Sequence, residues 1–450
     1  MKMPSSSSLR TLVYALRGGF LVRPLAIAIC MGAAGAILSS LEESFPALES
    51  AVPEILFPSN TDPQSAQTIL ASIATSTMTV VSIVFAILLM TLTLASTQFS
   101  PRLLINFVRD RVTQGTLGIF LGTFSYCIAA MPAARSMPKP FAPTLTVMGA
   151  MALTPICVGW LIYFIHHISN AISVNHIVDR IRRETELVID GLMPERRRPM
   201  QHAEIIGEFP GELEVAIPSR QSGYIRFVDI DRLRQLTKHY RVCLRLERRV
   251  GHFVPAGVAL MRTTRGDRIT PKREEEFLSA IDIGPTRTLQ QDVEFGVVQI
   301  VDVALRAISP AVNDPTTAIS CVDQLSSILI RWIGRAPPRR AFFDPPHVLR
   351  VVVPWIGLEG LLDLAFEQIR HYGVADAAVS LRLMRALDDI VSTVNDPVLQ
   401  QRIIERGRRL VEGCEGKLQS DDFSRLQRRG KALESRQLIA SGAHRSVENL

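Results

Sequence analysis

Hydrophobic and polar positions divide this chain into an apolar first third and a charged remainder. Four long apolar stretches occupy residues 21–41, 69–96, 114–133 and 141–169. A helix needs about 20 apolar residues to cross the roughly 30 Å of hydrocarbon in a bilayer, and each stretch reaches that length. A peptide group without a hydrogen bond costs several kcal/mol in lipid, so each stretch is expected to be helical. The pattern predicts a transmembrane region of four helices over residues 21–169.

The second stretch is the most polar of the four. At about 100° per residue, seven of its hydroxyl side chains fall within about a third of the helix circumference. Such hydroxyls bond their own backbone, bond a neighbouring helix or line a wet path. Residues 83–90 hold no polar side chain, which favours helix packing over a pore, and both roles stay open. The stripe consists of Ser72, Thr75, Thr79, Ser82, Thr93, Ser96 and Thr97.

Residues 170–210 are predicted to form a membrane-proximal helix and a linker. The fourth stretch is expected to continue into this region as one long helix to about Asp190. His166 and Asn170 share a face of that helix at the predicted membrane boundary. Imidazole at such a place binds an ion, senses pH or simply reaches toward headgroups, and the sequence does not decide among these roles.

The hydrophobic period changes to two over residues 211–263, which predicts a small β-module. The alternation stops at 229–240, where apolar residues recur at helical spacing. Residues 250–260 resemble the turn-and-strand pattern of lipoyl- or biotinyl-like barrel-sandwich domains, in which glycines allow sharp turns. Domains of that kind carry a modified lysine on an exposed hairpin, and this sequence has no lysine at the corresponding place. We therefore expect a structural, β-barrel-like module with no cofactor attached.

Residues 274–440 are predicted to be mainly helical. Asp314 and Asp396 each precede a proline, and an Asp cap followed by Pro at the first helical position is a strong start signal. Together with a basic lead-in (1–20) and a tail (441–450), the sequence predicts a mixed fold with four transmembrane helices and an α+β cytoplasmic domain. Helices are expected near 289–308, 314–333, 358–372, 375–394, 397–412 and 421–440, with one buried strand at 348–353.

The densest group of polar residues lies in the helix–loop–helix region 287–323. Its loop places polar side chains beside a helix N-terminus, where free amides favour a phosphate or carboxylate. The alternative is that the same residues cap and join two core helices. Asp302 and Arg306 are four apart and are expected to pair. The candidate set is Arg287, Asp292, Asp302, Arg306, Ser309, Asn313, Asp314, Thr316 and Thr317.

Charge indicates the orientation in the membrane. The chain carries a formal net charge of +7, with bases in the N-terminal segment and in the loop 100–112 but none between the first two stretches. The positive-inside rule then predicts a bacterial inner-membrane protein with both termini in the cytoplasm. Bases near the surface favour anionic lipids, so the charge needs no nucleic acid as a partner. A cleaved signal peptide over the first stretch is the competing interpretation.

Several segments resemble DUF2254, a family of uncharacterised bacterial predicted membrane proteins. They include Ser96–Arg102, Gly118–Tyr126 and the run from Val301 to Thr317, together with Gln291 and Phe295-Gly296. The resemblance covers most of the chain. It implies a membrane location and this overall architecture, and it brings no catalytic residue or substrate.

Two functions remain open at the level of sequence. No nucleophile elbow, zincin, Walker or dinucleotide motif is present, and the six cysteines lack metal-ligand spacing, so we expect neither an enzyme nor a metal site. The first hypothesis is a homo-oligomeric gated channel or transporter for ions or small solutes. The second is a membrane-anchored sensor or scaffold that binds a small ligand or a protein partner through the cytoplasmic domain.

Overall fold

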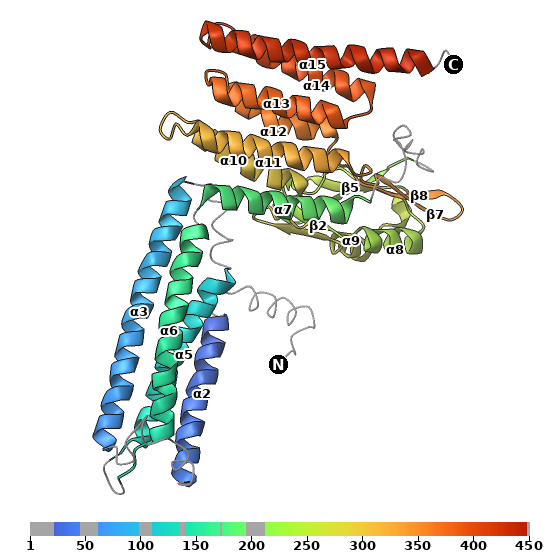
Figure 1. Cartoon of the computed structure of the whole chain (residues 1–450). Helices are drawn as coiled ribbons and strands as arrows, with labels where there is room; N and C mark the ends of the chain where they lie inside the picture. The colour runs from blue at the N-terminus through green and yellow to red at the C-terminus, as the bar shows by residue number, and fades with distance from the viewer. Residues whose placement is uncertain are drawn as a thin grey trace. The chain divides into compact units, whose positions relative to one another are not determined.

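The computed structural model describes residues 22–45, 62–98, 110–135, 140–171, 173–194 and 212–447. The chain divides into two compact units, Met1–Ser173 and Val174–Leu450 (Figure 1). The first contains the apolar helices and is called the membrane unit. The second contains the sheets and the remaining helices and is called the soluble unit.

The membrane unit is built from four long helices. These are α2 (Val22–Ser44), α3 (Pro63–Gln98), α5 (Arg111–Ala130) and α6 (Thr144–Ala171), with a short 3-10 turn, η3 (Met131–Ala133), after α5. Within the described residues, all four are long and apolar enough to cross a membrane. The four predicted helices are therefore confirmed, with boundaries close to those expected.

Small residues let α2 pack closely against α5, its main partner among the four helices. A Cβ on Gly35 of α2 would lie only 2.5 Å from the carbonyl oxygen of Tyr126 on α5, and one on Gly118 of α5 would lie 2.5 Å from Ile27. Close backbone approach at small residues is a common basis for helix association in lipid, where no hydrophobic effect drives packing. The glycine positions thus determine the α2–α5 contact.

The predicted continuous helix to Asp190 is wrong. Helix α6 ends at Ala171 and α7 (Val174–Leu192) begins after a break, in which the amide of Ser173 donates to the carbonyl of Asn170. The sequence pattern explains the break. Helix α6 is apolar on all sides, whereas α7 is apolar on one face only. That face packs on α10 (Val293–Ala307) and α11 (Pro315–Ile333) of the soluble unit.

Two sheets share one apolar core in the soluble unit. The core includes Ile217, Ile225, Leu244 and Val351, which come from strands of both sheets. Strands β3 and β8 are parallel and all other pairs are antiparallel. The sheet orders are β1-β5-β3-β8-β7 and β4-β2-β6, with β1 Val215–Pro218, β2 Gly223–Val228, β3 Leu244–Leu246, β4 Phe253–Val254, β5 Ala259–Thr263, β6 Ile281–Gly284, β7 Ala341–Asp344 and β8 Val348–Val352.

The predicted β-module supplies five of these strands and later residues complete the sheets. Strands β6, β7 and β8 lie beyond residue 263, so the sheets draw on more of the chain than the module 211–263. The predicted strand at 348–353 is confirmed as β8. Both strand orders are open-ended in the part of the chain that the structure describes, and a closed barrel is not confirmed. Helices α8 (Ile230–Tyr240) and α9 (Pro271–Leu278) and the turn η4 (Gly266–Arg268) connect the strands.

The remaining helices form layered hairpins (Figure 1). Helix α10 pairs with α11, α12 with α13, and α14 with α15, and neighbouring hairpins pack on one another. Asp314 and Asp396 cap α11 and α14 with proline at the first turn, as predicted. The helix expected from residue 289 begins later because Asp292 caps it. The bounds are α10 Val293–Ala307, α11 Pro315–Ile333, α12 Leu358–Gly373, α13 Ala377–Thr393, α14 Pro397–Cys414 and α15 Ser420–Val447.

Candidate functional site

The hydroxyl stripe of α3 lies on the face of the helix that the chain's own packing leaves open. Ser72, Thr75, Thr79, Ser82 and Thr93 are all exposed. The buried side chains of α3, such as Leu70 and Val84, belong to the apolar clusters with α5 and α6. The side chains of Ser96 and Thr97 lie outside the described residues. We call the five exposed hydroxyl residues the α3 hydroxyl face.

Most hydroxyls of this face donate to the backbone of their own helix. Thr75, Thr79 and Ser82 donate to the carbonyl oxygens four residues earlier, at 2.9, 2.9 and 3.2 Å. Thr93 does the same to Leu89 at 2.8 Å. A hydroxyl that donates in this way keeps lone pairs that accept a bond from a neighbouring helix, from water or from a cation. The face is therefore compatible with lipid and can also receive a polar contact.

The interior of the membrane unit is filled by side chains. One apolar cluster gathers around Leu70, Cys127 and Val147, and a second around Phe120 and Phe164. The buried hydroxyl of Thr123 contacts the sulfur of Cys157 at 3.3 Å between them. Among the described residues, a polar route through the membrane unit would have to run along an outer face rather than through its centre.

A buried carboxylate joins α2 to the start of α6. Glu42 is 2% exposed, and its Oε1 accepts the amide of Leu145 at 2.6 Å. Its Oε2 accepts the amide and the hydroxyl of Thr146 at 3.1 and 3.0 Å. First-turn amides have no partner inside their own helix, and the positive end of the helix dipole favours an anion there. This role of Glu42 could not be predicted from the sequence, because it depends on a helix about a hundred residues away.

A second carboxylate joins the start of α5 to α6. Asp110 caps α5 by accepting the amide of Thr113 at 2.9 Å, and its Oδ2 lies 3.0 Å from Nε2 of His167. The neighbouring His166 contacts the amide nitrogen of Asn170 at 3.0 Å. Along the chain, no acid lies between His166 and Asp179. The structure supplies one from another helix, so His167 has a carboxylate partner.

The candidate residues Arg287 and Asp292 form an ion pair at the start of α10, in which Asp292 is buried and Arg287 is half-buried. Two guanidinium nitrogens of Arg287 donate to the two carboxylate oxygens of Asp292, each at 2.8 Å. Asp292 also accepts the amide of Phe295 at 3.0 Å, which caps α10. The backbone of Gly251, at φ +87°, lies against this pair, and a Cβ there would overlap the Asp292 carboxylate. The pair ties the loop around Gly251 to the start of α10.

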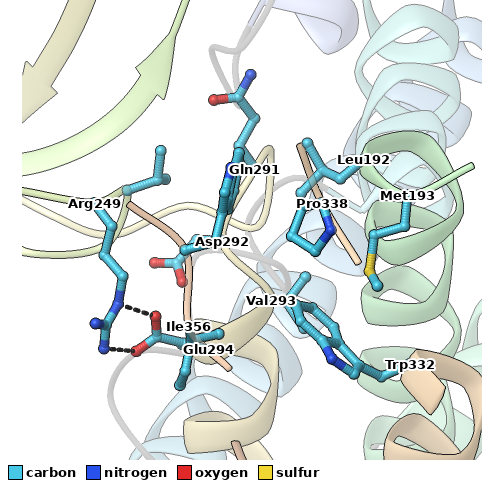
Figure 2. Close-up of a pocket in the computed structure, with 12 residues that line it drawn as sticks. Leu192, Met193, Arg249, Gln291, Asp292, Val293, Glu294, Trp332, Pro338 and Ile356 are labelled. Atoms are coloured by element: carbon cyan, nitrogen blue, oxygen red, sulfur yellow. Dashed lines mark hydrogen bonds and ion pairs between the residues drawn. The ribbon is translucent and has the colours of Figure 1, made fainter. Parts of the chain in front are cut away.

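A second ion pair stands beside the first, at the hollow in Figure 2. Arg249 donates from two nitrogens to the carboxylate of Glu294, with 3.0 Å between Nη2 and Oε2. The hollow holds about 20 Å³, which is room for little more than one water molecule. Burial lowers the pKa of the adjacent His252, and the positive charge of Arg249 lowers it further. The start of α10 is thus closely packed with matched charges.

The carboxylate of Asp314 occupies the N-terminus of α11. Its oxygens accept the amide and the hydroxyl of Thr317 at 3.1 and 2.6 Å, and these bonds hold the pKa of Asp314 below its ordinary value. An anion entering this loop would meet that negative charge. Asn313 adopts φ +50°, and its side chain and that of Thr316 are exposed. The geometry is that of a helix cap.

The other candidates of this region are distributed along α10 and its end. The hydroxyl of Ser309 donates to the carbonyl of Arg306 at 2.6 Å. Asp302 and Arg306 are half-buried on α10, and the predicted pair between them stays a prediction. Among the described residues, no three His, Cys, Asp or Glu side chains are grouped so as to hold a metal ion.

Comparison with known proteins gives a consistent picture. The chain matches the family described as Predicted membrane protein (DUF2254) over residues 17–389, from before α2 into α13. It is 33% identical over 389 residues to uncharacterised proteins of Mycobacterium bovis and Mycobacterium tuberculosis strain H37Rv, which covers 85% of this chain and 73% of each relative. No solved structure matches the chain.

Proposed function

Since the chain belongs to the DUF2254 family of predicted membrane proteins, we propose that it is a homo-oligomeric gated conduit for ions or small solutes. The observation that carries this proposal is the open α3 hydroxyl face. Hydroxyls on membrane helices gather at helix–helix contacts or along wet paths. The interior of one copy is packed with side chains, so the path would form between copies, along α3.

The distribution of residues along α3 suggests where such a path is gated. The hydroxyls from Ser72 to Ser82 extend over about 15 Å of helix. Exposed apolar residues follow, including Ile83, Leu89 and Met90. A ring of such side chains gates a pore by excluding water from it. The soluble unit would regulate this constriction through α7, which directly follows the last membrane helix in the chain.

The test is solute flux through liposomes that contain the purified full-length protein. Thr79→Val and Ser82→Ala remove exposed hydroxyls with little change of shape, and flux should fall while the unfolding temperature is kept. Thr77→Val is the matched control, since the Thr77 hydroxyl is buried and donates to the carbonyl of Ile73 at 2.9 Å. Its flux should match the wild type once the amount of folded protein is equalised. A wild-type protein that passes neither monovalent nor divalent ions would contradict the proposal.

The conduit would stand in a bacterial inner membrane with both termini in the cytoplasm. The basic segments at the N-terminus and after residue 100, and the absence of bases between the first two helices, support that orientation. Topology reporters fused after residue 60 and after residue 202 should report opposite sides, the second one cytoplasmic. A periplasmic signal after residue 202 would overturn the orientation.

The second candidate function is a membrane-anchored sensor or scaffold without enzymatic turnover. A cavity in the soluble unit favours it. The cavity has a volume of about 380 Å³. Met193, the residue that follows the end of α7, is part of its lining. That volume lies within the range of small-molecule sites, roughly 300–1,000 Å³. Flux separates the two candidates, because a sensor binds its ligand without passing any solute.

A further inference from the structure

The cavity in the soluble unit has an apolar wall and a basic rim. Its apolar side chains come from the end of α11, the start of α12 and the start of α14, and include Trp332, Leu358 and Leu399. Arg335 and Arg340, from the segment between α11 and β7, also line it. We call it the Trp332 cavity, after its largest buried side chain.

The acidic side chains of the lining are already engaged. Glu359 is paired with Arg402. Asp396 accepts the amide of Val398 at 2.9 Å as the cap of α14. Both carboxylates thus have partners of their own, and neither forms an ion pair with Arg340.

The two arginines of the rim differ in their pairing. Arg335 is paired with the carboxylate of Asp190, which it shares with Arg331, at 2.7 and 2.5 Å. Arg340 is exposed, and its side chain makes no ion pair with any described residue. Arg340 therefore brings a positive charge to the rim of the cavity.

The start of α12, at the same cavity, has no side-chain cap. Gly357 is the cap of α12 and has no side chain to accept the first-turn amides. Asp314, Asp376 and Asp396 perform that task at the starts of α11, α13 and α14. Gly357 also lines the cavity. Free amides at a helix start, together with arginine, are the usual surroundings of a bound carboxylate or phosphate.

We propose that the Trp332 cavity binds a small amphipathic organic anion. The anionic group would bond the α12 amides and Arg340, and the apolar body would lie against Trp332 and Leu399. The proposal is independent of the conduit, because binding is measured without flux. If both proposals are correct, the anion that binds to the soluble unit is the ligand that regulates the conduit.

The residues that line the cavity suggest how ligand binding would affect other parts of the protein. Met193, Trp332, Pro338 and Ile356 also line the hollow of Figure 2, so these side chains separate the cavity from the ion pairs at the start of α10. Met193 directly follows the end of α7. A ligand that moves these side chains would change the packing of α7, the helix next to the membrane unit in the chain.

Binding is tested by titration calorimetry on the full-length protein in lipid nanodiscs, with empty nanodiscs as the blank. The probe is 4-phenylbutyrate, and 4-phenylbutanol is its uncharged counterpart. The carboxylate should bind saturably and at least about tenfold more tightly than the alcohol, as expected when one charge-assisted bond is lost. Equal affinities, or no saturable binding of the carboxylate, would overturn the proposal. Inorganic phosphate binding as tightly as the probe would overturn the role of the apolar wall.

Two pairs of variants locate the site. Gly357→Asp places a carboxylate where the ligand's anion would lie, so it should abolish binding while the unfolding temperature is kept or rises slightly. Gly357→Ala adds only a methyl group, and a Cβ there meets nothing within 4 Å, so binding should persist. Arg340→Gln should weaken binding about tenfold, whereas Arg339→Gln, next to it and outside the lining, should not. Unchanged affinity in Gly357→Asp would refute the assignment.

Discussion

Glu42 on α2 and Thr146 on α6 are held together by two hydrogen bonds to one carboxylate oxygen, at 3.1 Å from the amide and 3.0 Å from the hydroxyl. With the bond from Leu145, the side chain of one membrane helix caps the start of another. The arrangement fixes the relative height of α2 and α6, since a shift by one residue would leave those amides unpaired.

This capping predicts that Glu42→Gln destabilises the membrane unit. The substitution keeps the shape, removes the negative charge at the start of α6 and turns one acceptor into a donor that faces an amide. The expected loss is about 1–3 kcal/mol, the cost of a buried polar group left without a partner. The control is Glu43→Gln, which breaks the exposed pair with Arg135 and should cost less than about 1 kcal/mol. Thermal unfolding in detergent measures both, and equal losses would contradict the role of Glu42.

Local signals in the sequence predicted the elements well. Asp314-Pro315 and Asp396-Pro397 begin helices because cap and proline act within one turn, so no distant residue has to be known. Length and composition were enough to predict the four apolar helices. The same reasoning placed β8, whose buried run of branched residues is typical of a central strand.

Pairings between distant segments could not be predicted in the same way. The Asp110–His167 contact joins residues 57 positions apart, and β3 pairs with β8 more than a hundred positions away. Nothing near His167 in the sequence indicates which acid will meet it. The break between α6 and α7 was missed for a different reason. The spacing of apolar residues stays helical across the break. The boundary is marked only by a change from a helix that is apolar on all sides to one that is apolar on a single face.

The Arg287–Asp292 pair predicts a large effect from a single substitution. Asp292→Ala removes a carboxylate that is 3% exposed and leaves the guanidinium of Arg287 without its partner. Loss of one member of a buried pair costs about 3–5 kcal/mol, and the α10 cap is lost as well. Glu275→Ala breaks the exposed pair with Arg220 and should cost at most about 1 kcal/mol. Chemical unfolding followed by circular dichroism of the full-length protein compares the two.

Two glycines with the same backbone geometry provide a matched pair of variants. Gly251 has φ +87° and Gly257 has φ +83°, so alanine at either position carries a similar backbone strain of about 1–3 kcal/mol. A Cβ at Gly257 meets nothing within 4 Å, whereas one at Gly251 would overlap the Asp292 carboxylate. Gly251→Ala should therefore lower the unfolding temperature clearly more than Gly257→Ala. Similar losses from the two would mean that Gly251 does not support the ion pair.

The Asp314 cap predicts a stability difference that depends on pH. The hydroxyl and amide of Thr317 lower the pKa of Asp314 below its ordinary 3.8, because both bonds favour the charged carboxylate. A carboxylate with a lowered pKa stabilises the fold above its ordinary pKa, and the gain is lost as the pH falls through the lower, folded-state pKa. At pH 7, Asp314→Ala should cost about 1 kcal/mol, the usual value of a helix cap. As the pH falls below 3.8, Asp314 of the unfolded chain binds a proton first and that of the folded chain follows at its lower pKa, so the difference between the two proteins should shrink steadily. Asp267→Ala, at a side chain that is 77% exposed, controls for the general effect of acid. Unfolding temperatures of the three proteins between pH 7 and pH 2 test this, and a difference that stays constant with pH would show that the charge of Asp314 does not stabilise α11.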